Sequence, residues 1–178
     1  MPHIHTDPGQ HDLTTTAFII RTDMDAPRGL VHVHRKLGLL LPVGGHVELD
    51  ENPWAASIHE IREESGYDIN QLKVLQPTER IVKMDGVKVH PVPLFLQTHE
   101  FKKDANHFHV DVGFLYVADK APANLPDDGE ASELLWLTKE EINTRADEMP
   151  ADIAQIYDFC FDVALEEWER ISPDAFDA

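Results

Sequence analysis

Apolar and polar residues alternate, or β-branched residues run together, in several separate segments of the chain. We expect strands there, because a strand presents successive side chains to opposite faces of a sheet. The expected strands are residues 14–21, 29–35, 39–41, 72–75, 87–95, 107–118 and 134–137. Pro91 and Pro93 interrupt one of these segments, which predicts an edge strand at that place.

Other segments have the spacing of amphipathic helices. They are residues 53–65, a short piece opened by a capping box from Thr138 to Glu141, and a long C-terminal helix over residues 151–171. Asn52 followed by a proline is a start signal for the first helix, and Gly66 is its stop signal. Strands mixed with helices predict an α/β or α+β fold in which helices flank a sheet.

The length and composition predict one domain over residues 1–178, since 178 residues with 42% hydrophobic content suffice for a single core. The sequence contains no long apolar run and no basic, apolar leader at its start, which predicts a soluble, cytoplasmic protein. Cys160 is the single cysteine, so an internal disulfide and a multi-thiolate zinc site are excluded.

The net charge of the chain disfavours polyanionic partners. Lys and Arg number 15 against 33 Asp and Glu, a net charge of −18 with neutral histidines. A chain of this charge repels a nucleic-acid duplex or an anionic membrane at long range. A compact anionic ligand would need a metal ion or a basic pocket to offset that field.

Acidic residues gather on one side of the predicted helix over residues 53–65. Glu60, Glu63 and Glu64 fall within about 100° of arc on a helix, where like charges repel one another. Oxygen ligands of this kind suit a hard cation such as Mg²⁺ or Mn²⁺. The alternative is a solvated acidic helix face, which is common in acidic proteins.

Residues 45–67 have a spacing that goes beyond an acidic helix. The segment has two glycines and four glutamates at fixed intervals, namely Gly45, Glu51, Glu60, Glu63, Glu64 and Gly66. This pattern resembles the Nudix box. A Leu-Pro-Val-Gly-Gly lead-in and a later Glu133-x-x-Trp136 segment are also similar to that family. With these flanks the resemblance covers about residues 14–145, the core of the domain, and leaves a C-terminal helix over residues 150–171.

The resemblance implies a Nudix-like α/β/α sandwich with a mixed β-sheet, followed by the C-terminal amphipathic helix. It implies a hydrolase that cleaves a phosphoanhydride bond in a nucleoside diphosphate linked to another moiety. Such substrates include nucleoside triphosphates, ADP-ribose and nucleotide sugars. The implied cofactor is Mg²⁺ or Mn²⁺, which would polarise phosphorus and lower the pKa of a bound water.

The resemblance also assigns roles residue by residue. The implied metal ligands are Glu60, Glu63, Glu64 and the carbonyl of Gly44, and the implied catalytic residues are Glu63, Glu64 and His59. Glu63 is either a further ligand or the base. Gly45 and Glu51 would support the loop and the helix.

One position departs from the family pattern. His59 stands where the Nudix box has an arginine, and imidazole lacks the permanent charge and planar fork of guanidinium. Helical spacing places His59 next to Glu63, so an imidazolium would orient that glutamate and make activity depend on pH near neutrality. The alternative is that His59 is a tolerated surface residue.

The eleven histidines include two pairs at strand spacing. His32 and His34 share one face of a strand, and His107 and His109 share a face with Asp111. These rows would line the substrate cleft, or form the solvent side of half-buried strands. Two histidines with an aspartate would alternatively hold a second metal ion, zinc or manganese. The substrate-binding candidates are Arg35, His107, His109, Asp111 and Glu130.

Two rival functions share this pattern. The first is a non-catalytic Nudix-like module that binds a nucleotide or metabolite as a sensor, favoured by His59 alone. The second is an isomerase of isopentenyl diphosphate, which needs a catalytic cysteine, whereas Cys160 is expected on the buried stripe of a helix. The predicted partners are a small phosphorylated nucleotide-type substrate and a second copy in a homodimer.

Overall fold

A computed structural model of the chain describes residues 7–100, 106–127 and 131–176. The strands are β1 (His11–Arg21), β2 (Arg28–His34), β3 (Leu40–Leu41), β4 (Val43–His46), β5 (Leu72–Gln76), β6 (Phe95–Glu100), β7 (Phe108–Ala118), β8 (Ala131–Leu137) and β9 (Glu169–Ile171). The α-helices are α1 (Pro53–Glu60), α2 (Lys139–Thr144), α3 (Ala151–Phe159) and α4 (Leu165–Glu167). Two π-helical turns, η1 (Ile61–Ser65) and η4 (Cys160–Ala164), continue α1 and α3. Short 3₁₀ turns are η2 (Ile69–Gln71), η3 (Ala146–Glu148) and η5 (Pro173–Ala175).

All strands belong to one mixed sheet with the path β3-β2-β1-β7-β5-β9, to which β4, β6 and β8 add by pairing with β1, β7 and β2. The central pair, β1 and β7, is parallel along its whole length, from His11 opposite Phe108 to Arg21 opposite Ala118. The other pairings are antiparallel. This confirms the α/β fold with a mixed sheet.

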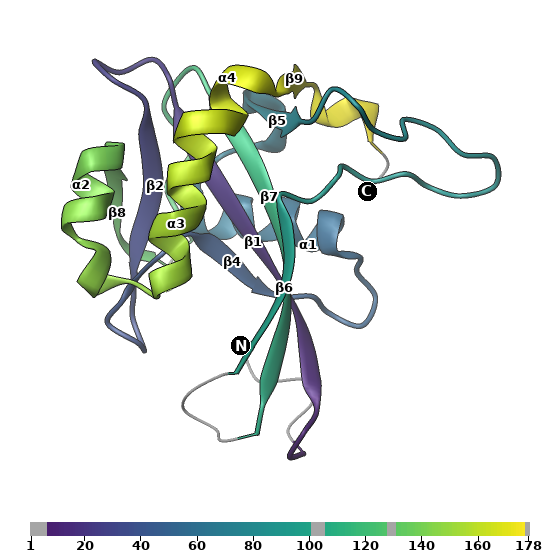
Figure 1. Ribbon diagram of the computed structural model, residues 1–178, viewed down its shortest axis with the longest axis horizontal. Coiled ribbons are helices and arrows are strands. Elements are labelled where there is room, and N and C mark those ends of the chain that lie inside the picture. The colour runs from purple at the N-terminus through teal and green to yellow at the C-terminus, as the bar shows by residue number, and fades with distance from the viewer. Residues whose placement is uncertain (1–6, 101–105, 128–130, 177–178) are drawn as a thin grey trace.

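Helices cover both faces of the sheet, as expected for a sandwich. Figure 1 shows α3 lying across one face of the sheet. On this face, α3 and η4 pack Ile153, Tyr157 and Cys160 against Phe18 and Leu115. On the other face, α1 and η1 pack Trp54 and Ile61 against Ile19, Phe114 and Tyr116. Alternate residues of β1 and β7 therefore enter two different cores, as the period-two pattern of a strand requires.

The helix that carries the acidic residues forms where its end signals predict. The Asn52 side chain accepts a hydrogen bond of 2.9 Å from the Ala55 N–H, and Pro53 is the first helical residue. Gly66 ends the helix in the left-handed conformation with φ of 74°, which costs glycine little. The difference is in the last turn, which is π-helical and therefore wider.

Two predicted segments differ in the structure. Residues 87–94 form no strand, and β6 begins only at Phe95, because Pro91 and Pro93 have no N–H to donate to a neighbouring strand. The C-terminal helix ends at Glu167 rather than Ile171. The following residues form β9, where Ile171 pairs with Val74 of β5 and completes that edge of the sheet.

Among the residues described, every helix is too short or too polar to cross a membrane.

Candidate functional site

Strand β4 brings the backbone of its two glycines against the acidic helix. The Gly44 N–H donates a hydrogen bond of 2.9 Å to Oε2 of Glu64. At Gly45, a Cβ atom would lie 2.1 Å from Oε1 of Glu60, so only glycine permits this approach. The structure therefore unites Gly44, Gly45, Glu60 and Glu64, which the sequence separates by the whole loop after β4.

Burial distinguishes this site from a solvated acidic face. The exposed fractions of Glu60 and Glu64 are 4% and 7%, although both residues carry carboxylates one helical turn apart. Two like charges so close in a water-poor site are unfavourable without a cation. All-oxygen donors of this kind fit Mg²⁺ or Mn²⁺, so the residues present suit the implied cofactor. Gly44 meets Glu64 through its N–H, and the role of its carbonyl stays a prediction.

His32 of β2 is the neighbour of Glu64 on the sheet side. Its Nε2 lies 3.6 Å from Oε2 of Glu64, and its side chain is 2% exposed. Burial, together with the charge of His34, lowers the pKa of His32 to about 4, despite a hydrogen bond to the Pro42 carbonyl. At pH 7 the His32 imidazole beside Glu64 is therefore neutral.

His59 lies between two of the predicted site glutamates. Its Nε2 is 2.8 Å from Oε1 of Glu63, and its Nδ1 is 3.3 Å from Oε1 of Glu51. Burial by itself would lower the pKa of His59, but the hydrogen bond to Glu63 and the charges of Glu63, Glu51 and Glu60 outweigh burial and raise it. The contact with Glu63 is the one that helical spacing predicts. The contact with Glu51 holds the other ring nitrogen and could not be predicted from helical spacing.

Glu63 has a different environment from its two neighbours on the helix. Its side chain is 32% exposed and bonded to His59, whereas Glu64 is directed to Gly44 and His32. Among the described residues, the three glutamates do not bring their ligand atoms within 4.8 Å of one another. A more accessible carboxylate beside two buried ones suits a proton acceptor at the edge of a metal site.

The second histidine row lies on the opposite face of the sheet from α1. By strand alternation, His107, His109 and Asp111 share the α3 face with Leu115. Hydroxyl groups of Thr14 and Thr16 donate to the Asp111 carboxylate at 3.1 and 2.8 Å. Burial raises the pKa of Asp111 against these two bonds.

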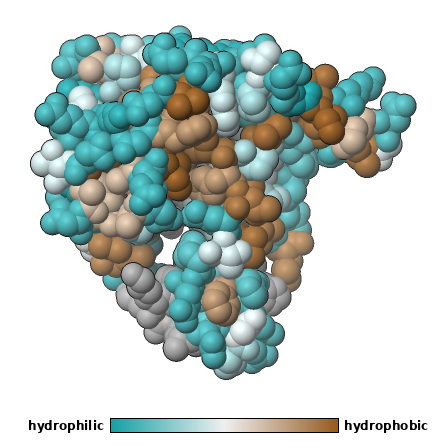
Figure 2. All heavy atoms as spheres, viewed as in Figure 1, coloured by the Kyte–Doolittle hydropathy of each residue, from teal (hydrophilic) through white to brown (hydrophobic). Residues whose placement is uncertain are grey.

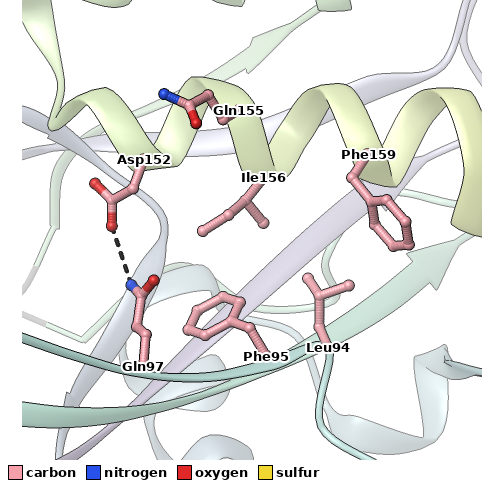
Figure 3. A pocket seen from close by; sticks show the side chains of 7 residues that line it. All are labelled: Leu94, Phe95, Gln97, Asp152, Gln155, Ile156 and Phe159. Carbon is pink, nitrogen blue, oxygen red and sulfur yellow. Dashed lines mark hydrogen bonds between the residues drawn. The ribbon is translucent and has the colours of Figure 1, made fainter.

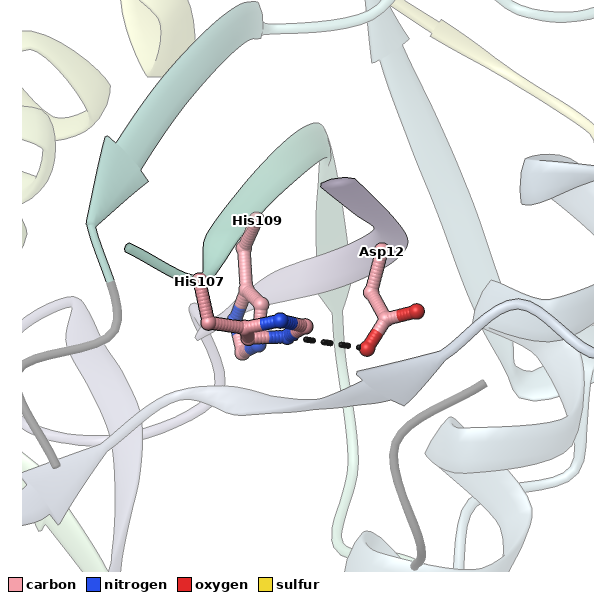
Figure 4. A group of neighbouring side chains, drawn as sticks. All are labelled: Asp12, His107 and His109. Carbon is pink, nitrogen blue, oxygen red and sulfur yellow. Dashed lines mark ion pairs between the residues drawn. The ribbon is translucent and has the colours of Figure 1, made fainter. Parts of the chain in front are cut away.

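The carboxylate beside the two histidines is Asp12, which the sequence reasoning missed. Oδ2 of Asp12 lies 3.0 Å from Nε2 of His107, and ligand atoms of Asp12, His107 and His109 all lie within 4.8 Å of one another (Figure 4). Asp12 enters because β1 and β7 are parallel and pair it with His109. Asp12 lies two residues before the strand expected over residues 14–21, and nothing local in the sequence indicates that β7 pairs with this segment.

The two remaining substrate-binding candidates stay predictions. Arg35 lies in the exposed turn between β2 and β3. Glu130 falls outside the described residues.

An apolar groove separates α3 from β6 on the α3 face. It has a volume of about 330 Å³ and is lined by Leu94, Phe95, Gln97, Asp152, Gln155, Ile156 and Phe159. Figure 3 shows the apolar side chains of both elements directed toward the space between them, and a hydrogen bond of 3.0 Å from Gln97 to Asp152 at one end. Brown apolar atoms cross the centre of that face among hydrophilic ones in Figure 2.

Cys160 is fully buried in η4 among the residues of the α3 face. Burial raises the pKa of its thiol, so the sulfur stays protonated and out of reach of a substrate. The isomerase alternative therefore lacks the accessible catalytic cysteine that it needs.

Residues 12–160 match the family model described as the NUDIX domain. Among solved structures, the chain is similar to a hydrolase of the NUDIX family from Clostridium perfringens, with 25% identity, a TM-score of 0.64, and coverage of 83% of this chain and 97% of that one. It is also similar to an Ap4A hydrolase from C. elegans, with 18% identity, a TM-score of 0.61, and coverage of 82% and 91%.

A third similar structure is the NUDIX domain of NrtR from Shewanella oneidensis in complex with ADP ribose. Its identity is 14%, its TM-score is 0.60, and the match covers 85% of this chain and 89% of that one. The curated proteins contain no significant match to the chain. The last two structural similarities support the fold.

Proposed function

Since the chain belongs to the Nudix family, we propose that it hydrolyses, with Mg²⁺ or Mn²⁺, a phosphoanhydride bond in a nucleoside diphosphate linked to another moiety. Family membership makes it a hydrolase acting on pyrophosphate bonds. The observation that carries the proposal is the burial of Glu60 and Glu64 against the glycines of β4.

The buried carboxylates would hold the cation. Glu60 and Glu64 act as ligands, and the Gly44 carbonyl completes the protein donors. A bound divalent ion supplies charge neutralisation for the diphosphate and lowers the pKa of a coordinated water. The chain has a net charge of −18, so the cation held by these ligands would also offset the repulsion between the protein and an anionic substrate.

Glu63 is positioned to accept a proton from the attacking water. Its carboxylate is exposed enough to meet solvent and is oriented by the 2.8 Å contact with His59. His59 is in turn fixed by Glu51 on its other ring nitrogen. In this proposal His59 is a positioning residue that acts through Glu63.

The proposed substrate is of the nucleotide type. The C. elegans and Shewanella structures, an Ap4A hydrolase and a domain bound to ADP ribose, support a nucleotide-type substrate. Arg35, in its exposed turn, would contact a phosphate group. The single cysteine supports a reducing compartment such as the cytoplasm. A homodimer stays a prediction, which sedimentation equilibrium tests.

A substrate panel with defined variants tests the proposal. Nucleoside triphosphates, ADP-ribose, nucleotide sugars and dinucleoside polyphosphates are incubated with Mg²⁺ or Mn²⁺, and products are separated by chromatography. We expect turnover of one substrate class, with kcat reduced about 10²–10⁴-fold in Glu63→Gln if Glu63 is the base. Glu64→Gln should reduce both turnover and metal affinity.

Glu166→Gln provides a matched control, because Glu166 is an exposed glutamate of α4. It should leave kcat unchanged. Metal and nucleotide binding without turnover of any substrate would contradict the hydrolase and favour the sensor module.

A further inference from the structure

A second group of metal-ligating side chains lies at the end of the sheet where β1 and β7 begin. Asp12 is the second residue of β1, His107 directly precedes β7, and His109 is the second residue of β7. Their exposed fractions are 0%, 5% and 8%, so all three lie inside the protein. Figure 4 shows the His107 imidazole directed toward the Asp12 carboxylate, and the His109 ring packs edge-on against His107 with a centroid distance of 5.4 Å.

A third imidazole joins them from β4. Nε2 of His46 lies 3.5 Å from Oδ2 of Asp12, and the His46 ring packs edge-on against His109 with a centroid distance of 5.2 Å. Thr14 pairs with His46 across the β1–β4 ladder, which places His46 on the α3 face with Asp12. Three strands therefore direct three imidazoles and one carboxylate to the same point.

We propose that Asp12, His107 and His109, with His46 beside them, form a binding site for one zinc ion. The site is separate from the glutamate site, whose ligands come from the helix on the other face of the sheet. It goes beyond the hydrolysis proposed above and does not depend on it.

The distances are close to those that zinc requires. Ligand atoms at about 2.0–2.1 Å from a tetrahedral zinc ion lie roughly 3.4 Å apart. The Asp12–His107 pair is at 3.0 Å, the Asp12–His46 pair is at 3.5 Å, and all ligand atoms of the Asp12–His107–His109 set lie within 4.8 Å.

The donor types select the ion. Imidazole nitrogen with a single carboxylate suits zinc, whereas Mg²⁺ prefers oxygen donors and retains several waters. The two sites of this chain therefore differ in kind, with carboxylates on the α1 face and mainly imidazoles on the α3 face.

A simple ion pair explains less of the arrangement. One protonated histidine would balance the charge of Asp12, but an ion pair of this kind does not account for three imidazoles gathered around one carboxylate. A zinc ion held by Asp12, His107 and His109 would link β1 to β7, and the contact of His46 with Asp12 would join β4 to this link. His46 directly follows Gly45, so the link would also steady the strand that carries the glycines of the glutamate site.

Metal stoichiometry tests the site directly. The full chain, purified without an affinity tag, is loaded with one equivalent of Zn²⁺, desalted, and analysed by mass spectrometry for bound metal. We expect one zinc per chain in the wild type and in Glu64→Gln. In His109→Ala and in Asp12→Asn, zinc affinity should fall by more than the about 10–100-fold that loss of an outer-shell partner costs.

His11→Ala is the matched control, because His11 is an exposed histidine next to Asp12 that stacks on Phe108. It should retain zinc. Circular dichroism shows whether each variant is folded. If a variant does not fold, the visible absorption spectrum of the wild-type chain loaded with Co²⁺ tests the site instead. A tetrahedral site of nitrogen and oxygen ligands gives intense visible absorption.

Three results would overturn the proposal. The first is a wild-type chain that retains no zinc or gives no tetrahedral Co²⁺ spectrum. The second is zinc that disappears in Glu64→Gln but persists in His109→Ala, which would assign it to the glutamate site. The third is a wild-type chain that binds no zinc and binds nucleotide more tightly than His109→Ala does. That result would make these imidazoles direct substrate contacts.

Discussion

Histidine at position 59 changes how Glu63 is oriented. Its pKa is raised by Glu63, Glu51 and Glu60, against the effect of burial, so the imidazolium persists to higher pH than in the unfolded chain. A raised pKa in the folded state means that the ion pair is fully formed below the unfolded value and is lost as pH rises through the folded value. Orientation of Glu63 should weaken over the same range.

We therefore expect His59→Arg to raise kcat and to flatten its pH profile, because arginine keeps its charge throughout. The measurement is kcat from pH 5 to 9 for both proteins, under saturating metal. His59→Gln is the control, and it should give a flat profile at a lower rate. An unchanged profile in His59→Arg would mean that His59 is a tolerated surface residue.

Gly45 sets the approach of β4 to Glu60. A Cβ atom at this position would lie 2.1 Å from the Glu60 carboxylate, so Gly45→Ala must displace that side chain. We expect weaker Mg²⁺ binding, by about tenfold or more, as for a displaced ligand. Isothermal titration calorimetry measures the affinity.

Gly113→Ala serves as the comparison for Gly45→Ala. There the new Cβ atom would meet the Phe95 ring at 2.3 Å, away from the glutamates. It should lower the thermal midpoint and leave Mg²⁺ affinity unchanged. Equal effects of the two variants on Mg²⁺ would contradict a local role for Gly45.

At the scale of the element, the acidic helix depends on its first turn. The Asn52 side chain caps the Ala55 N–H, and the helix it starts carries all three site glutamates. Asn52→Ala should destabilise the protein by about 0.5–2 kcal/mol. At roughly 2–4 °C per kcal/mol for a domain of this size, calorimetry will detect the fall in melting temperature.

Asn52→Asp retains a capping oxygen and should melt close to the wild type. If both variants melt alike, the cap contributes nothing and the helix is held by tertiary packing alone.

The elements differ in how far sequence predicts them. The helix from Pro53 to Ser65 was predictable because its cap, its stop and its periodicity are local. β9 was not, since Trp168 and Ile171 continue the helical spacing, and the segment from Glu169 to Ile171 forms a strand only because it pairs with the edge of β5. Asp12 was missed for a related reason: its position beside His109 depends on pairing between strands far apart in the chain.

The Nudix glutamates were predictable from their spacing, but their burial was not. Spacing placed Glu60, Glu63 and Glu64 on one arc and left a solvated face open as an alternative. Only the approach of Gly44 and Gly45 buries Glu60 and Glu64 and leaves Glu63 half-buried. That difference depends on the tertiary position of β4.

At the scale of the whole molecule, charge opposes folding. A net charge of −18 generates self-repulsion that salt screens, because the Debye length falls from about 30 Å at 0.01 M to about 10 Å at 0.1 M. We expect the melting temperature to rise as NaCl increases over this range. Surface ion pairs such as Lys139–Asp162 are screened as well, but each contributes little.

Differential scanning fluorimetry in NaCl measures this effect, with sucrose as a control that does not screen charge. A melting temperature that falls with salt would mean that attractive ion pairs outweigh the net repulsion.

The parallel pairing of β1 and β7 has a consequence for synthesis on the ribosome. The hydrogen-bonded side chains of Thr14 and Asp111 are 97 residues apart. At about 5–20 residues per second, β1 emerges roughly 5–20 s before its central partner. During that interval β1, with its apolar residues Phe18, Ile19 and Ile20, cannot yet pair with β7. The nascent chain is then most exposed to aggregation and most in need of a chaperone.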